Sequence, residues 1–389
     1  MKVVIAIDSF KGSLSSVRAG NAAAEGIKRV FKDAETIVLP VADGGEGTAE
    51  ALVSGLNGKF RSISVLDPLG RSINAAYGIL PDGTAVIEMA AASGLTLLAE
   101  EERDPMHTTT YGTGQMIRDA AEQGCRSFII GIGGSATNDG GIGCLQALGF
   151  GMLGADGKQV CFGAEGLSKL TAINDNNVLP QLRECSFRVA CDVGNPLCGG
   201  NGCSAVFARQ KGADDDDTIK LMDSYMERYA QLTKGYCPAA DPDTAGSGAA
   251  GGLGFALMYY LNARLASGID LVIQASGMEK AVQSADIVVT GEGCIDSQTA
   301  MGKAPAGIAA LAKKYGKPVI AFCGAAGIGA SLCNEKGIDA FFPVLRQVSS
   351  AEEAMDSANA AHNLADTAEQ VFRTIKAFRA ETHYERGIK

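Results

Sequence analysis

Residues 131–141 are the part of the sequence best suited to bind an anion: they read Gly-Ile-Gly-Gly-Ser-Ala-Thr-Asn-Asp-Gly-Gly and follow an apolar run. Glycines let main-chain N–H groups approach a phosphate closely, and the start of the helix expected after them adds partial positive charge. This pattern predicts a phosphate-binding loop after a strand. The residues expected to hold nucleotide phosphates are Gly133, Gly134, Ser135 and Thr137.

A second junction of the same kind lies near the other end of the chain, where a mostly apolar run at residues 286–290 leads into Gly291-Glu-Gly-Cys-Ile-Asp296. We expect a glycine loop here too, with Gly291 and Gly293 at the nucleotide phosphates. Glu292 and Asp296 would bind the metal, directly or through water, because Mg²⁺ prefers oxygen ligands such as carboxylates. Two such junctions, each carrying an acid, predict a site for a phosphorylated nucleotide and its metal.

Acidic residues also stand at the starts of other predicted loops. The full set is Asp8, Asp43, Glu46, Asp139, Asp192, Glu292 and Asp296. Each of them alone is also typical of a turn or a helix cap. Together with Lys11 and Lys211, which stand beside glycines, they match phosphoryl transfer to an alcohol. That reaction needs backbone donors, metal-binding carboxylates, a cation and an acid that takes the hydroxyl proton.

Other catalytic patterns are weaker. The chain has no Gly-x-x-x-x-Gly-Lys-Ser/Thr motif, which excludes a P-loop enzyme. Gly131-x-Gly133-x-x-Ala136 fits the relaxed dinucleotide pattern and leaves a nicotinamide enzyme open, but no convincing acidic strand end follows about 20 residues later to hold a ribose. None of the three histidines stands near a Gly-x-Ser-x-Gly motif, which disfavours a Ser-His triad.

The overall composition limits location and partners. A net charge of −10 argues against a nucleic-acid surface, and no apolar run is long enough for a membrane span. The eleven cysteines form no Cys-x-x-Cys pair, which is typical of a protein from a reducing cytosol. We therefore expect a cytoplasmic protein that binds neither nucleic acid nor membranes, and a homo-oligomer is left open.

Hydrophobic periodicity predicts a two-domain α/β protein. Strands alternate with helices at both ends of the chain, which is typical of a doubly wound, Rossmann-like parallel sheet, while three short runs between residues 60 and 89 are separated by hairpin turns. The expected Rossmann-like domain comprises residues 1–60, 104–145 and 284–389, and an inserted mixed α/β lobe comprises residues 61–103 and 146–283. The active site is expected in the cleft between them. The acidic run at residues 214–217 is interpreted as the first turn of a helix rather than as a metal site.

Several motifs, in order along the chain, closely resemble the type 1 glycerate kinases. They lie at residues 6–13, 41–48, 88–95, 131–141, 190–197, 210–213, 248–252 and 291–298. The resemblance spans about residues 1–375. It implies ATP-dependent phosphorylation of D-glycerate by two unequal α/β domains, and Mg²⁺ is expected from the acids described above.

Three positions depart from the pattern of that family. Ile7 stands where the family usually has Pro, Arg209 stands where it usually has Pro before Gln-Lys-Gly, and Cys294 stands where Arg is frequent. The last change removes a cation that could bind phosphate. Arg209 or Lys303 could take its place.

The resemblance and the positions of the acids together suggest roles for single residues. Asp192 is assigned as the catalytic base, because it ends a short apolar strand and enters a Gly-Asn-Pro turn that can fix its direction. Lys11 is assigned as the second catalytic residue. Substrate binding is assigned to Asp8, Ser9, Asp43, Glu46 and Lys211. The sequence does not separate the base from the metal ligands among these acids.

The resemblance implies transfer to the 2-hydroxyl of D-glycerate, giving 2-phosphoglycerate. Because the two hydroxyls sit on adjacent carbons, 3-phosphoglycerate is the alternative product. The alternative function is a non-catalytic sensor of sugar acids or nucleotides on the same fold. The acids argue against a sensor, because a protein that only binds two anions gains nothing from carboxylates beside them.

Overall fold

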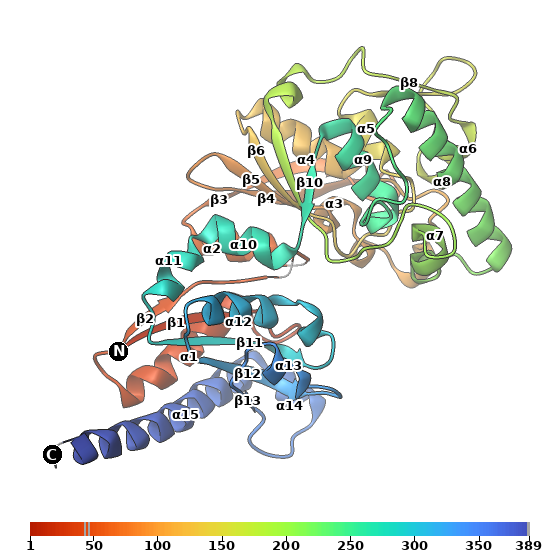
Figure 1. Ribbon diagram of the computed structural model, residues 1–389. Helices are drawn as coiled ribbons and strands as arrows, with labels where there is room; N and C mark the ends of the chain where they lie inside the picture. Colours follow the sequence, from red (N-terminus) through yellow and green to blue (C-terminus); the bar gives the residue numbers. More distant parts are fainter. Residues whose placement is uncertain (43, 46, 387–389) are drawn as a thin grey trace. The chain divides into compact units, whose positions relative to one another are not determined.

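The computed structural model describes residues 1–42, 44–45 and 47–386, with side chains described up to residue 378. It divides into two compact units (Figure 1). Unit 1 comprises Met1–Asp43 and Val272–Lys389, and unit 2 comprises Gly44–Leu271. Among the described residues, no helix combines the length and the apolar character that crossing a membrane requires.

Unit 1 is built on a five-stranded sheet in the order β13-β12-β11-β1-β2, with every neighbouring pair parallel. The strands are β1 (Lys2–Ile7), β2 (Glu35–Val38), β11 (Ile287–Ile295), β12 (Val319–Ala326) and β13 (Ala340–Pro343). The first two come from the N-terminal part of the chain and the others from the C-terminal part. The pairing of β1 with β11 therefore joins the two ends of the sequence into one sheet.

Helices cover both faces of this sheet (Figure 1). On one face, α1 (Ser16–Val30) and α15 (Ser357–Arg386) pack against each other over a core that includes Ile5, Val289 and Phe322. On the other face, α12 (Ala304–Lys314) contacts β1, β11 and β12 without joining that core. The shorter helices are α11 (Met278–Gln283), α13 (Leu332–Glu335) and α14 (Ala351–Met355), and α10 (Gly268–Ser276) spans the boundary between the units. The arrangement confirms a doubly wound α/β layer.

Unit 2 is built on a mixed six-stranded sheet in the order β10-β9-β6-β5-β4-β3. The strands are β3 (Lys59–Leu66), β4 (Ser72–Ile79), β5 (Thr84–Glu88), β6 (Ser127–Gly131), β9 (Ser186–Ala190) and β10 (Arg264–Ala266). β5, β6, β9 and β10 pair in parallel, and β3, β4 and β5 pair antiparallel, as the hairpin turns predicted. A separate antiparallel pair is formed by β7 (Gly151–Leu153) and β8 (Ala172–Asn174).

The sheet of unit 2 carries a large core in which Phe128 stacks on Phe187 with ring centroids 4.8 Å apart. Its α-helices are α2 (Thr48–Gly55), α3 (Ala90–Ser93), α4 (Tyr111–Glu122), α5 (Ile142–Ala147), α6 (Gly163–Lys169), α7 (Cys203–Phe207), α8 (Asp216–Tyr236) and α9 (Leu253–Leu261). The 3-10 helices of the described residues are η1 (Leu95–Leu97), η2 (Glu100–Glu102), η3 (Pro180–Glu184), η4 (Arg209–Lys211), η5 (Ala249–Gly252) and η6 (Thr299–Met301). The Asp215 side chain accepts the N–H of Thr218 at the start of α8, which confirms that the acidic run begins a helix.

The units differ from the domains expected from the sequence. Residues 44–60 and 104–145, which we expected in the Rossmann-like domain, lie in unit 2. For residues 104–145 the reason is strand pairing, because β6 lies between β5 and β9 and so belongs to the same sheet as the hairpin strands. Hydrophobic periodicity identifies such a strand but does not say which sheet it joins.

The contact between α1 and α15 generates a first prediction. A Cβ at the buried Gly26 of α1 would lie 2.0 Å from the backbone oxygen of Ala365, so Gly26→Ala should force the helices apart. We expect a loss of about 2 kcal/mol in the free energy of unfolding, as for other overpacked cores. Denaturant unfolding measures the loss, and hydrogen exchange of α1 amides locates it.

The matched control is Gly235→Ala, an exposed glycine in α8 whose Cβ would meet nothing within 4 Å. This change should be neutral or stabilise the protein by up to about 1 kcal/mol, because alanine favours the helix. Equal effects of the two substitutions would contradict the packing argument.

Candidate active site

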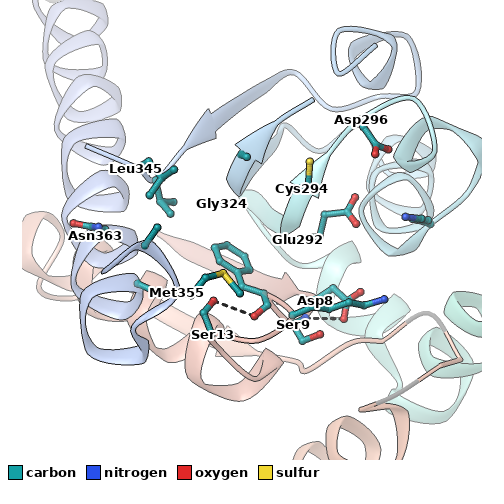
Figure 2. Close-up of a pocket in the computed structure, with 18 residues that line it drawn as sticks. Asp8, Ser9, Ser13, Glu292, Cys294, Asp296, Gly324, Leu345, Met355 and Asn363 are labelled. Carbon is teal, nitrogen blue, oxygen red and sulfur yellow. Dashed lines mark hydrogen bonds between the residues drawn. The ribbon is translucent and has the colours of Figure 1, made fainter. Parts of the chain in front are cut away.

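Four neighbouring parallel strands of unit 1 end at one cavity of about 390 Å³ (Figure 2). Residues 8–11 follow β1, residues 292–296 form and follow the end of β11, residues 324–325 lie near the end of β12, and residues 344–345 follow β13. The carboxyl ends of parallel strands are the usual place for ligands in α/β sheets. The cavity therefore lies where the topology of the sheet predicts a binding site.

Three of the predicted acids line this cavity: Asp8, Glu292 and Asp296. Asp8 and Glu292 are 7% and 8% exposed, and Glu292 Oε1 accepts the hydroxyl of Thr299 at 2.5 Å. Asp8 Oδ1 accepts the N–H of Ser9 at 2.7 Å, and Asp296 Oδ1 accepts the N–H of Gln298 at 2.8 Å. These hydrogen bonds fix the directions of the three carboxylates in the cavity.

The oxygen ligands in this cavity fit a Mg²⁺ ion that is bound together with nucleotide phosphates better than an ion coordinated by protein side chains alone. In the part of the chain that the structure describes, no group of three or more His, Cys, Asp or Glu is arranged to hold an ion. Mg²⁺ commonly takes only one or two carboxylates from the protein, together with substrate phosphates and water. Glu292 and Asp296 would therefore suffice for Mg²⁺ only if a nucleotide supplied the other ligands.

Positive charge in the cavity comes from Lys11 and Lys303. Lys303 lies in the same cavity as Cys294, the position where arginine is frequent in the resembled family. Arg209, the other proposed replacement, lies in unit 2 and forms an ion pair with Asp216. Of the two, Lys303 is the cation that shares a cavity with Cys294.

The glycine loop expected at Gly291–Gly293 is a strand, so this prediction is wrong. β11 continues to Ile295, and Gly291 pairs with Ile7 on one side and Phe322 on the other. A Cβ at Gly291 would lie 2.0 Å from the Phe322 carbonyl oxygen. Glycine is therefore needed here for close packing of strands, and of the two glycines only Gly293 is among the residues that line the cavity.

The second group of predicted residues lies at the carboxyl ends of the parallel strands of unit 2. Gly44 and Gly45 pass close to these strand ends. A Cβ atom added at Gly131 would lie 2.5 Å from the Gly44 oxygen, and one added at Gly133 would lie 3.2 Å from the Gly45 Cα. Glycine pairs in both segments let the two backbones touch. Asp43 and Glu46, expected to bind substrate, fall outside the described residues.

Asp192 follows β9, as the sequence predicted. Its Oδ1 accepts the N–H of Gly268 at 3.1 Å, which ties the end of β9 to the segment after β10. The residue is exposed. The carboxylate thus stands at the same edge of the sheet as the glycine segments and has a fixed direction.

The loop after β6 is hydrogen-bonded to the buried side chain of Lys211. Its ammonium donates to the Ser135 hydroxyl at 2.8 Å and to the Thr137 carbonyl at 2.7 Å, and the residue is 2% exposed. Burial lowers the pKa of Lys211 to about 8, although the nearby Asp139 and Cys203 oppose this shift. We expected Lys211 to contact substrate, but the structure directs its ammonium to the loop.

Asp139 is a structural residue. It is fully buried and accepts four hydrogen bonds, from the N–H and hydroxyl of Thr110 and from the N–H groups of Gly141 and Gly143. Burial raises the pKa of this carboxyl despite these bonds. For Asp139, the interpretation as a turn former was therefore the correct one.

Sequence reasoning missed two features of these sites. Glu88, the last residue of β5, accepts the N–H of Ala49 at the start of α2 at 2.7 Å. The cavity of unit 1 is also lined by Leu345, Met355 and Asn363 from the C-terminal segment. An acid at a strand end could have identified Glu88, but no local pattern links the C-terminal residues to β1.

Comparison with known proteins places the chain in a family. The family model described as "Glycerate kinase family" matches residues 3–376. The glycerate 2-kinase of Escherichia coli (strain K12) is 46% identical over 373 residues, covering 94% of this chain and 98% of that protein. A glycerate kinase of Bacillus subtilis (strain 168) is 45% identical over 377 residues, covering 97% and 98%.

A solved structure agrees with these sequence matches. The crystal structure of putative glycerate kinase 2 from Salmonella typhimurium LT2 superposes with a TM-score of 0.90 at 44% sequence identity, and it covers 98% of this chain and 99% of that one. The match extends over both units. With two strand-end sites rich in glycines and acids, and with this likeness along nearly its whole length, the chain belongs to the glycerate kinase family.

Proposed function

We propose that this protein transfers the terminal phosphoryl group of ATP to the 2-hydroxyl of D-glycerate in a Mg²⁺-dependent reaction, giving 2-phosphoglycerate. The observation that carries the proposal is the cavity at the carboxyl ends of β1, β11, β12 and β13, lined by carboxylates and lysines, in a chain of the glycerate kinase family. The name of the Escherichia coli relative supports position 2 of glycerate.

In unit 1, Glu292 and Asp296 are proposed to bind Mg²⁺ and Lys11 to neutralise charge on the transferring group. When bound, the metal would offset the negative charge of the phosphates. Asp8 and Ser9 contribute to substrate binding beside them. Support comes from their shared cavity, because all five residues line it.

In unit 2, Asp192 is proposed as the general base. It would take the proton of the 2-hydroxyl as the oxygen attacks phosphorus, while the N–H of Gly268 keeps the carboxylate in one orientation. The loop containing Gly133, Gly134, Ser135 and Thr137 is proposed to bind phosphate through its backbone. Lys211 acts through that loop, to which its ammonium is hydrogen-bonded.

The alternative of a non-catalytic sensor has less support, because relatives across nearly the whole chain are named as kinases. A cytoplasmic location agrees with eleven cysteines that are all free. A site in a cleft between two domains, a homo-oligomer, and the assignment of Asp43 and Glu46 to substrate stay predictions.

The reaction itself is tested by ADP release in the presence of D-glycerate, ATP and Mg²⁺. We expect turnover that requires all three, with 2-phosphoglycerate identified by phosphorus NMR or by direct coupling to enolase without phosphoglycerate mutase. A product that is only 3-phosphoglycerate would overturn the regiochemistry alone. Folded protein that binds both substrates without turnover would favour the sensor.

Substitution of the proposed base should separate chemistry from stability. Asp192→Asn should lower kcat by about 10²-fold or more, the usual scale for a general base. The melting temperature should change little, because the amide oxygen of asparagine can still accept the Gly268 N–H. Asp217→Asn, at an exposed position of the acidic run, is the control and should retain wild-type kcat. An unchanged kcat in Asp192→Asn would remove this residue from the mechanism.

The buried Lys211 should make stability depend on pH. Its pKa is about 8 in the folded protein against an ordinary 10.5, so between these values the unfolded chain binds a proton that the folded chain does not. Stability therefore rises with pH in this window, relative to a variant without the amine. We expect the stability of wild type relative to Lys211→Met to be greater at about pH 10 than at about pH 7.

Urea unfolding at the two pH values measures this difference, and Lys220→Met provides the control at an exposed position of α8. Asp139 and Cys203, the titratable groups near the ammonium, are present in every variant. A stability difference between wild type and Lys211→Met that stays constant with pH would contradict the proposed burial of the amine.

A further inference from the structure

The cavity of unit 1 has a polar end and an apolar end. In Figure 2, Glu292 and Asp296 lie on one side of the cavity, and Leu345 and Asn363 lie on the other. The apolar lining includes Phe10, Val344, Leu345, Ala354, Met355 and Ala360. This surface has no part in the roles assigned so far, which concern phosphates, metal and glycerate.

Glycerate cannot account for the apolar end. It is a small molecule with a carboxylate and two hydroxyls, and it offers no apolar face to such a wall. A nucleotide offers both kinds of surface, since its base is flat and largely apolar on its faces while its phosphates are charged. A volume of about 390 Å³ is also in the range of pockets that enclose drug-sized ligands.

The apolar end combines a buried wall with residues that remain exposed. Phe10, Val344 and Ala360 are between 3% and 4% exposed, whereas Leu345 and Met355 are 44% and 46% exposed. A flat ligand in this part of the cavity would cover the exposed side chains, which is favourable in water. Methionine adapts its shape to such a ligand because its side chain is unbranched and flexible.

One polar side chain at this end can distinguish bases. Asn363, on α15, offers an amide with one acceptor and two donors. An asparagine pairs well with the N6 amine and N7 of adenine, whereas the O6 and N7 of guanine are both acceptors and favour Arg or Lys. The lining therefore suits adenine better than guanine.

We propose that the apolar end of this cavity is the base-binding subsite for adenine, with the base against Leu345 and Met355 and Asn363 at its edge. The phosphates then extend towards Lys11 and the acids at the end of β11. The inference rests on the proposed function, which requires an ATP site, and it assigns recognition of the base to unit 1. It also gives the segment after β13 a role in choosing the phosphoryl donor.

Calorimetric titration of the full chain with ADP and Mg²⁺ tests the subsite. Leu345→Glu places a carboxylate where the base would lie, so the Kd for ADP should rise at least about tenfold. Binding of inorganic tripolyphosphate and the KM for glycerate should stay near wild type, because neither ligand reaches the apolar end. The control is Leu332→Glu, since Leu332 is also 44% exposed in unit 1 but does not line the cavity.

Asn363→Leu tests the choice of base and should reduce the preference for ADP over GDP by about tenfold. Folded Leu345→Glu protein with wild-type affinity for ADP would overturn the subsite, as would an equal weakening of ADP and tripolyphosphate binding. The proposed kinase function fails separately, by the absence of glycerate-dependent turnover. Because ADP binding is measured without glycerate, each idea can fail while the other stands.

Discussion

The parallel pairing of β1 with β11 is the contact on which unit 1 depends. It joins residues almost three hundred positions apart, with Ile7 opposite Gly291 and the N–H of Asp8 donating to the Gly291 carbonyl at 2.8 Å. This register places Asp8 and Glu292 at the same edge of the sheet. The pairing also buries the apolar side chains of both strands. A shift in register would therefore displace the two acids relative to each other and expose apolar core residues at the same time.

Close approach of backbones is the second constraint, and glycine makes it possible in both units. Gly291 lets β11 pack against the Phe322 carbonyl, and Gly131 lets the strand end touch Gly44. Any side chain at these positions would separate segments that now meet. The glycine-rich motifs therefore serve the architecture of the strand ends as well as any ligand, and a glycine-rich sequence does not by itself indicate a loop.

Hydrogen bonds to buried ionisable side chains fix the conformation of the loop after β6. Asp139, within the loop, accepts four hydrogen bonds, and Lys211 donates to Ser135 and Thr137. Both ionisable groups are held away from water, and the cost of burying them is offset by these bonds. A loop held in this way keeps its backbone groups in one arrangement before any ligand arrives.

The sequence by itself determined the α/β class, the hairpin of β3 and β4, the helix start at Asp215 and the resemblance to glycerate kinases, because these depend on local patterns. Tertiary structure decided the rest. It placed β6 in the mixed sheet, made Gly291 part of a strand, turned Lys211 towards a loop and brought Asn363 to the cavity. Strand partners and side-chain neighbours are set by contacts between distant residues, and a local pattern does not specify them.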